Sequence, residues 1–175
     1  MRDTGRAFID FSRALLSQDY LPKIERCLEL LNDQQIWWRA NPQSNSIGNL
    51  LLHLSGNVRQ WIVSGLGEAS DARDRDSEFA QREVISRDEL LARLKQTLQE
   101  ADDVLAKFDP DALLEKRRIQ GIDEVPALEA ILHVVEHFSM HTGQIILLAK
   151  FFAEVDLEFY DFTGPAPQPN WKREQ

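Results

Sequence analysis

The chain has 175 residues, 43% of them hydrophobic and 28% charged, which is typical of a single globular domain that buries its own core. Its 29 acidic and 20 basic residues give a net charge of -9, and this balance, without a basic stripe, argues against nucleic acid or an anionic membrane as a partner. The single cysteine, Cys27, excludes an internal disulfide and indicates a reducing compartment. The charged N-terminal residues are unlike a signal peptide, and no apolar run is long enough to span a bilayer, so we expect a cytoplasmic protein.

The first predicted helix covers residues 5–31, where apolar side chains recur at helical spacing. Pro22 interrupts this pattern, because proline lacks a backbone N–H and disfavours a helical residue before it. We therefore expect a kink or a restart at Pro22. Cys27 belongs to the apolar stripe of this helix, which predicts a packing role rather than a reactive thiol.

A second helix is predicted from Ser46 or Ile47 to Gly65, and it carries an unusual polar stripe. On a helical wheel, four uncharged residues lie within about 60° of His53: Asn49, Gly56, Asn57 and Gln60. Apolar residues flank the stripe, and the one charged residue, Arg59, points away from it. This pattern favours a buried polar seam over a solvent-facing surface, with Gly56 leaving room for a ligand or a close helix.

The connection at residues 67–85 is charged and lacks helical periodicity. We expect a solvated crossover loop there, and the alternative is a functional lid, because structureless connections of this length are uncommon in compact domains. In a lid, Arg73 and Arg75 would be available to bind a carboxylate. Ser86-Arg-Asp-Glu89 is a capping box, and it predicts a third helix that ends before Asp109-Pro110.

Residues 113–122 are predicted to be extended, and a fourth helix is predicted from near Asp123 to about Phe152, with Pro126 in its first turn. The proline-rich segment 155–175 is expected to be a non-helical tail, which Trp171 would hold against the surface. Together these patterns predict one all-α domain over residues 1–175. Its expected architecture is a four-helix bundle with a long crossover between helices two and three.

The strongest functional signal is the run His133-Val-Val-Glu-His137-Phe-Ser-Met-His141. Residues four apart lie about 40° apart around a helix, so all three rings project from one face, and two of them can converge on one metal ion. His53, on the second helix, can supply a third ligand from across the core. The alternative is that the four histidines are only polar groups at a surface or in a hydrogen-bonded core.

Neighbouring residues exclude several metal-site classes. A zinc protease needs Glu directly after the first histidine, but Val134 and Phe138 occupy those positions. Di-iron bundles need Glu three residues before histidine, and no histidine here has one. What remains is an all-nitrogen mononuclear site with an open position for water or a thiol, which suits zinc or nickel better than magnesium or calcium.

Periodicity alone leaves two candidate pairs on the fourth helix, His133 with His137 or His137 with His141. The end histidines are about 12 Å apart along the axis at ~1.5 Å per residue, too far to share an ion through bonds of ~2.0–2.1 Å. One end histidine is therefore expected in a second layer. If that residue is His133, its hydrogen-bond partner would be Glu129 or Glu136, while Gln144, one turn beyond His141, could support a metal-bound water or substrate.

Residues 1–155 resemble the DinB-like (DinB/YfiT-like) superfamily of metal-dependent four-helix bundles, on the basis of His53, His137-x-x-x-His141 and the following Thr142-Gly-Gln144. The resemblance implies that His53, His137 and His141 hold a divalent metal, often zinc or nickel. It also implies homodimers and, in some relatives, transferase or isomerase reactions with low-molecular-weight thiols. The segments at residues 45–49 and 73–79 resemble a subgroup without an assigned reaction.

Three functions remain open at this stage. The first is a metal-dependent transferase or hydrolase that activates a thiol or water, with a pocket formed by Trp61, Asn57, Gln60 and Gln144. The second is a metal-binding module without turnover. The third is an interaction protein with a polar histidine core. The identities of the metal and the substrate do not follow from the sequence.

Overall fold

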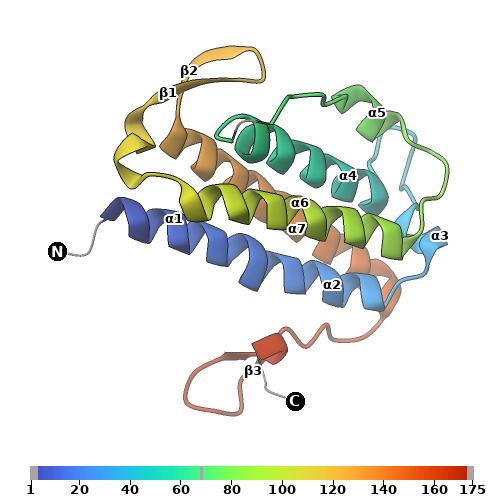
Figure 1. Cartoon of the computed structure of the whole chain (residues 1–175). Coiled ribbons are helices and arrows are strands. Elements are labelled where there is room, and N and C mark those ends of the chain that lie inside the picture. Colours follow the sequence, from blue (N-terminus) through green and yellow to red (C-terminus); the bar gives the residue numbers. More distant parts are fainter. Residues whose placement is uncertain (1–3, 68, 173–175) are drawn as a thin grey trace.

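Four long helical segments make up the bundle in the computed structural model, which describes residues 4–67 and 69–172 (Figure 1). The predicted all-α bundle is therefore confirmed. The first segment consists of α1 (Thr4–Ala14), the π segment η1 (Leu15–Tyr20) and α2 (Leu21–Glu29), which follow one another without a break. The second consists of α4 (Ile47–Val58) and the π segment η2 (Arg59–Ser64). The third and fourth are α6 (Arg87–Lys107) and α7 (Ala127–Ala153).

The long crossover follows from the direction of the helices. α4 packs against α6 and α7, and the segment α1–α2 packs against the same two helices from the other side. α4 and α6 run in the same direction (Figure 1), so the chain between them must return along the length of the bundle. Short helical elements lie in the connections between the long segments, namely α3 (Asp33–Ile36), α5 (Arg75–Ala80) and the 3-10 turn η3 (Pro110–Leu114).

Apolar side chains from all four segments form one core. Cys27 is fully buried within it, and burial raises the pKa of its thiol to about 12. A thiol with so high a pKa is a poor nucleophile, which supports the predicted packing role. The largest fully buried side chains are Phe138, Ile9, Ile24, Leu28, Ile36, Ile47, Leu51, Leu54, Ile62, Leu90, Leu94 and Leu105.

Side-chain caps determine where two of the bundle helices begin. Ser46 and Asn49 form a reciprocal capping box at the start of α4. Ser86 Oγ accepts a hydrogen bond from the Glu89 backbone N–H at 3.3 Å at the start of α6. Each cap satisfies a backbone donor that has no partner within its helix, so these two starts match the sequence prediction.

Pro22 affects the first helix as its chemistry requires. The π segment η1 ends immediately before α2, with Pro22 in the first turn of α2. Because Pro22 has no N–H, the Gln18 carbonyl lacks its α-helical donor. That carbonyl accepts a hydrogen bond from Trp171 Nε1 at 2.9 Å, so Trp171 holds the tail against the bundle as predicted.

A β-hairpin replaces the predicted start of the fourth helix. Strand β1 (Lys116–Ile119) pairs antiparallel with β2 (Ile122–Pro126). The connecting residues Gln120 and Gly121 have φ values of 56° and 76°, which is typical of a tight hairpin turn. The prediction of a helix from Asp123 was therefore wrong, because residues 122–126 pair with a strand, and Pro126 caps α7 instead of lying in its first turn.

The prediction of a loop at residues 67–85 was also wrong in part, because this connection contains the short helix α5. Asp74 begins α5, and its side chain accepts a hydrogen bond from the backbone N–H of Ser77. The tail is non-helical except for one 3-10 turn, η4 (Asn170–Lys172), and it contains the short strands β3 (Tyr160–Asp161) and β4 (Gln168–Pro169).

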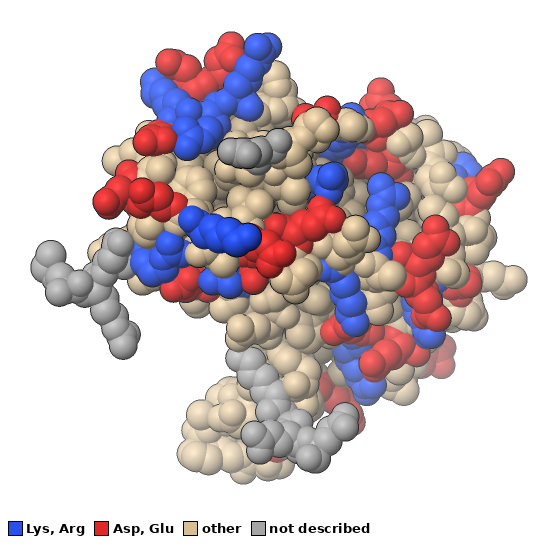
Figure 2. Space-filling model, viewed as in Figure 1, with Lys and Arg blue, Asp and Glu red and all other residues tan. Residues whose placement is uncertain are grey.

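The surface is charged but mixed in sign. On the face shown in Figure 2, Lys and Arg side chains are interspersed with Asp and Glu. Several apolar side chains of α7 are exposed to solvent, namely Leu132, Met140, Leu147 and Phe151. None of the described helices has the length and apolar composition needed to cross a membrane.

We predict that Leu94→Ala lowers the free energy of unfolding by about 2–5 kcal/mol, because it leaves a cavity in a close-packed core. Leu94 is 0% exposed. The matched control is Leu114→Ala, since Leu114 is 77% exposed and surface changes are usually within about 0.5 kcal/mol. Urea denaturation of both variants measures the difference, and equal stabilities would contradict the assigned core.

Candidate metal centre

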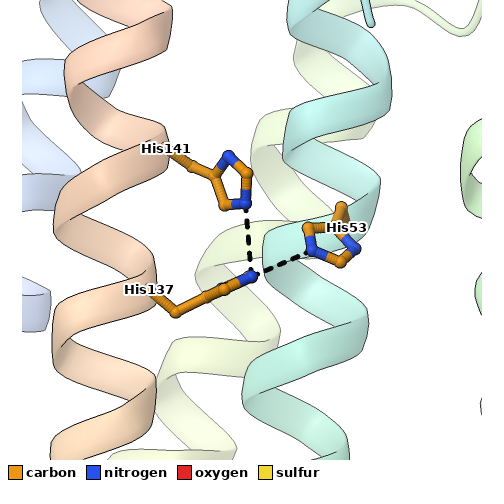
Figure 3. A group of neighbouring side chains, drawn as sticks. All are labelled: His53, His137 and His141. Carbon is orange, nitrogen blue, oxygen red and sulfur yellow. Dashed lines mark hydrogen bonds between the residues drawn. The ribbon is translucent and has the colours of Figure 1, made fainter.

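Three histidines from two helices meet between α4 and α7. Figure 3 shows the rings of His53, His137 and His141 turned toward one another. The Nε2 atom of His137 lies 3.0 Å from Nε2 of His53 and 3.2 Å from Nε2 of His141. One nitrogen from each ring lies within 4.8 Å of the others. A tetrahedral ion with bonds of ~2.0–2.1 Å holds neighbouring ligand atoms about 3.4 Å apart, so a divalent metal could bind here.

The outer ring nitrogens of two histidines lie against side-chain oxygens. His53 Nδ1 lies 2.9 Å from a carboxylate oxygen of Glu78, and His141 Nδ1 lies 2.7 Å from Oε1 of Gln144. Both oxygens are acceptors, so with the ring proton on Nδ1 each histidine donates to its oxygen. In this tautomer the Nε2 atoms of both rings present lone pairs to the centre.

This tautomer assignment fits a cation better than it fits a hydrogen-bonded cluster. A neutral His137 has at most one proton on Nε2, so it can donate to only one of its two neighbours. At least one short N···N contact is then a contact between lone pairs. A metal ion at the centre would accept all three lone pairs at once, which is the donor arrangement of a three-histidine site.

Burial keeps the central rings neutral. The pKa of His137 falls to about 3, first because burial penalises the charged form and then because His141, His53, His133 and Arg73 lie nearby. Burial also lowers the pKa of His141. Neutral imidazole is the form that binds metals, so His137 and His141 need not release a proton at neutral pH.

His133 lies beside this centre but belongs to a different set of contacts. Its ring packs on Trp61 with centroids 4.0 Å apart, and Nε2 lies 3.3 Å from Nδ2 of Asn57. The predicted hydrogen bond to Glu129 or Glu136 is replaced by this contact with α4. His133 is absent from the group of nitrogens that converge, so the structure brings the C-terminal pair to His53.

The other predicted pocket residues are divided between different partners. Gln144 orients His141 directly. Trp61 donates its indole N–H to Gln120 in the hairpin turn at 3.2 Å. Gln60 turns toward the crossover, where it donates to Asp71 at 2.8 Å and accepts from Arg73 at 2.9 Å. Trp61 and Asn57 thus flank His133, whereas Gln60 belongs to the crossover contacts.

Two buried polar atoms near the histidines have no hydrogen-bond partner among the described residues. They are Nδ1 of His137 and Oδ1 of Asn57. An unpaired buried polar atom costs about 1–3 kcal/mol, so such atoms concentrate where ligands or ordered water bind. A polar ligand beside the three rings would compensate this cost.

The crossover contributes a residue that the sequence analysis missed. Glu78, in α5, is 7% exposed and accepts the hydrogen bond from His53. Burial alone would raise its pKa, but hydrogen bonds from Arg73 and His53 lower it overall, so Glu78 is a carboxylate at neutral pH. Phe79 covers the other side of the His53 ring, with centroids 4.6 Å apart.

Two residues singled out in the sequence, Arg73 and Gly56, both contact Glu78. Arg73 does bind a carboxylate, but it is Glu78 of the same chain, whereas Arg75 lies over the Phe79 ring. Gly56 does leave room, and Glu78 fills it: a Cβ on Gly56 would lie 1.9 Å from Glu78 Oε1. The predicted polar seam on the second helix is confirmed as buried.

The lowered pKa of His137 predicts how the metal-free protein responds to acid. In the unfolded chain an imidazole takes up a proton near pH 6.5, but folded His137 resists protonation down to about 3. Stability is therefore lost as pH falls below about 6.5, since the unfolded state binds more protons. Urea denaturation at several values from pH 7 to pH 4.5 should show that the free energy of unfolding falls less steeply for His137→Gln than for the unmodified chain. Equal pH dependence of the two proteins would contradict a buried neutral ring.

Comparisons with known proteins agree with the fold. A crystal structure of a conserved protein from Enterococcus faecalis aligns with a TM-score of 0.66 at 15% identity, covering 83% of this chain and 97% of that one. A crystal structure of a DinB-like protein from Bacillus cereus aligns with a TM-score of 0.61 at 16% identity, covering 79% and 88%. No curated protein matches the sequence.

At these identities the two structures establish the fold alone, and they confirm the DinB-like architecture expected from the histidine motifs. The family follows from the sequence itself, because residues 3–162 match the family model described as "Protein of unknown function (DUF1572)". The chain is a member of the DUF1572 family, and it has the fold of a DinB-like protein.

Proposed function

We propose that this protein binds one divalent metal ion through Nε2 of His53, His137 and His141. The observation that supports this most directly is the convergence of these three nitrogens in a buried place, with two of the rings oriented through Nδ1 by Glu78 and Gln144. Oriented imidazoles are typical of metal sites, because a hydrogen bond on the outer nitrogen fixes the ring and its tautomer.

The donor set favours zinc or nickel. Three neutral nitrogens suit these ions, whereas magnesium and calcium prefer oxygen ligands. Three protein ligands also leave one tetrahedral position open, which distinguishes catalytic zinc sites from structural ones. When bound, such an ion supplies Lewis acidity and lowers the pKa of a coordinated water or thiol.

We further propose a metal-dependent transferase or hydrolase that acts through a thiol or a water. The residues of this chain would bind and orient the reactants. Oδ1 of Asn57 and Nδ1 of His137 are buried without partners among the described residues, so they are available to a polar ligand. His133 packs on Trp61 and contacts the Asn57 side chain, so these two aromatic rings lie beside Asn57. The second candidate is a metal-binding module without turnover. It would use the same three histidines, but no substrate would bind to Oδ1 of Asn57 and Nδ1 of His137.

A homodimer, a low-molecular-weight thiol substrate and a cytoplasmic location remain predictions. The exposed apolar side chains on α7 support self-association, because exposed apolar surface often marks protein–protein contacts. The fully buried single cysteine is compatible with a reducing compartment. The net charge of -9 argues against binding to nucleic acid.

The ligand assignment predicts different metal contents for four alanine variants. His53→Ala, His137→Ala and His141→Ala should each lose the metal, because two imidazoles hold an ion far more weakly than three. His133→Ala should retain the metal with altered affinity, since His133 contacts Asn57 and Trp61 instead. Elemental analysis of each purified protein measures this, and loss in His133→Ala with retention in His141→Ala would move the site by one helical turn.

The proposal also predicts that metal stabilises the fold. A ligand that binds only the native state contributes RT ln(1 + [L]/Kd), or about 2.7 kcal/mol at a hundredfold excess over Kd. Returning zinc or nickel to a stripped sample should therefore raise the melting temperature. The His137→Ala variant should show no such rise, and an unchanged melt of the unmodified chain would leave the metal site without support.

A further inference from the structure

A buried ion pair within the crossover lies next to His53 of α4. Arg73 and Glu78 form two parallel contacts, Nε to Oε1 at 2.7 Å and Nη2 to Oε2 at 2.9 Å. Their side chains are only 6% and 8% exposed. The oxygen Oε2 also accepts the proton of His53 Nδ1. One carboxylate is therefore shared between an arginine of the crossover and a histidine of the bundle.

Two groups lie within hydrogen-bonding distance of His53 Nδ1, and they require different tautomers of the ring. Nη2 of Arg73 lies 3.0 Å from His53 Nδ1, nearly as close as Glu78. A guanidinium nitrogen can only donate, and a carboxylate can only accept. With the proton on Nδ1, His53 donates to Oε2 of Glu78, which is the closer of the two groups, while Arg73 keeps its own two hydrogen bonds to the carboxylate.

Other residues hold this carboxylate at its position. Asn49 Nδ2 donates to the Glu78 backbone carbonyl at 2.8 Å, so the end of α5 is fastened to the start of α4. Gly56 allows the close approach, because any Cβ there would overlap Oε1. Gln60 accepts from Arg73 at 2.9 Å. The polar seam of α4 is thus occupied by the crossover along several turns of the helix.

A gain in folding stability does not by itself explain why a buried ion pair lies beside His53. Burying two charges has a desolvation cost that their attraction often does not recover, and apolar residues of similar size can be equally stabilising. An oriented carboxylate beside a metal-binding histidine has a second effect, since it fixes the ring and raises the basicity of the ligand nitrogen.

We propose that Glu78, held by Arg73, is a positioning residue for metal binding and that the crossover at residues 69–81 is thereby coupled to the metal. The inference rests on the proposed metal site. Glu78 acts through His53: it keeps the proton on Nδ1 and directs Nε2 toward the ion. The coupling is reciprocal, so bound metal also stabilises the closed crossover.

The first test compares Glu78→Gln with the matched control Glu83→Gln. Glu83 lies on the same connection with an exposed side chain, so both variants remove one negative charge from the same segment. Zinc affinity is measured by competition with a chelator. Glu78→Gln should bind about 10–100-fold more weakly, as is typical when an outer partner of a ligand is lost, and Glu83→Gln should bind like the unmodified chain.

The second test displaces Glu78 without changing its charge. Gly56→Ala places a Cβ where Oε1 now lies, so it should weaken zinc binding in the same way. In the Glu78→Gln background the same substitution should cost much less affinity, because the contact is already altered. Equal effects in both backgrounds would overturn the coupling through Glu78.

Two further readouts separate positioning from simple loss of structure. In stripped protein labelled with 15N-histidine, His53 should be protonated on Nδ1, and Glu78→Gln should shift it toward a mixture of tautomers. Amide hydrogen exchange of residues 69–81 should slow on adding zinc, and slow less in Glu78→Gln. A purely structural role would instead lower the melting temperature of the stripped variant while leaving zinc affinity and the tautomer unchanged.

The outcomes distinguish this inference from the proposed function. If the unmodified chain binds no zinc or nickel, the metal site itself is wrong. If the unmodified chain and Glu78→Gln bind zinc equally well, the site stands and the positioning role of Glu78 is overturned.

Discussion

The molecule is organised around the contact of three imidazole nitrogens between α4 and α7. In two of these rings the outer nitrogen lies against an acceptor oxygen, Glu78 for His53 and Gln144 for His141, and with the proton on that nitrogen their lone pairs face inward. Hydrogen bonds among the three rings cannot satisfy every lone pair. This constraint is the strongest physical argument for a cation at the centre, and it depends on tautomers rather than on proximity alone.

The same constraint explains why the crossover is built as it is. A solvated loop would leave the polar side of α4 facing water, and His53 would then have no fixed tautomer. Instead Arg73 and Glu78 enter the seam, with Asn49 and Gly56 accommodating them. Phe79 closes over the ring. The segment that connects two helices is therefore also part of the wall of the site.

Sequence reasoning predicted the bundle helices and the histidine face because both depend on local periodicity. Spacing alone did not separate the pair His133–His137 from the pair His137–His141, and the choice of the second pair rested on the resemblance. The structure places His141 beside His137 and His53, whereas His133 faces Trp61 and Asn57. Glu78 was missed for a related reason. In an acidic, charged segment nothing local marks one glutamate as buried, and only the approach of α5 to Gly56 makes it so. Residues 113–122 were predicted to be extended, and β1 lies there. The second strand of the hairpin, β2, was missed because it is short and rich in charge.

The positions of the three histidines along the chain determine what brings them together. His137 and His141 are one helical turn apart, so α7 presents this pair as soon as it is helical. His53 lies 84 positions from His137, and bringing it to the pair requires closing a long loop, whose entropic cost grows only slowly with length. The pair on α7 is thus a local feature of one helix, whereas His53 joins it only in the tertiary fold. A complete coordination set is consequently a property of the finished bundle, and an ion that needs three nitrogens can distinguish the folded protein from every partly folded form of it.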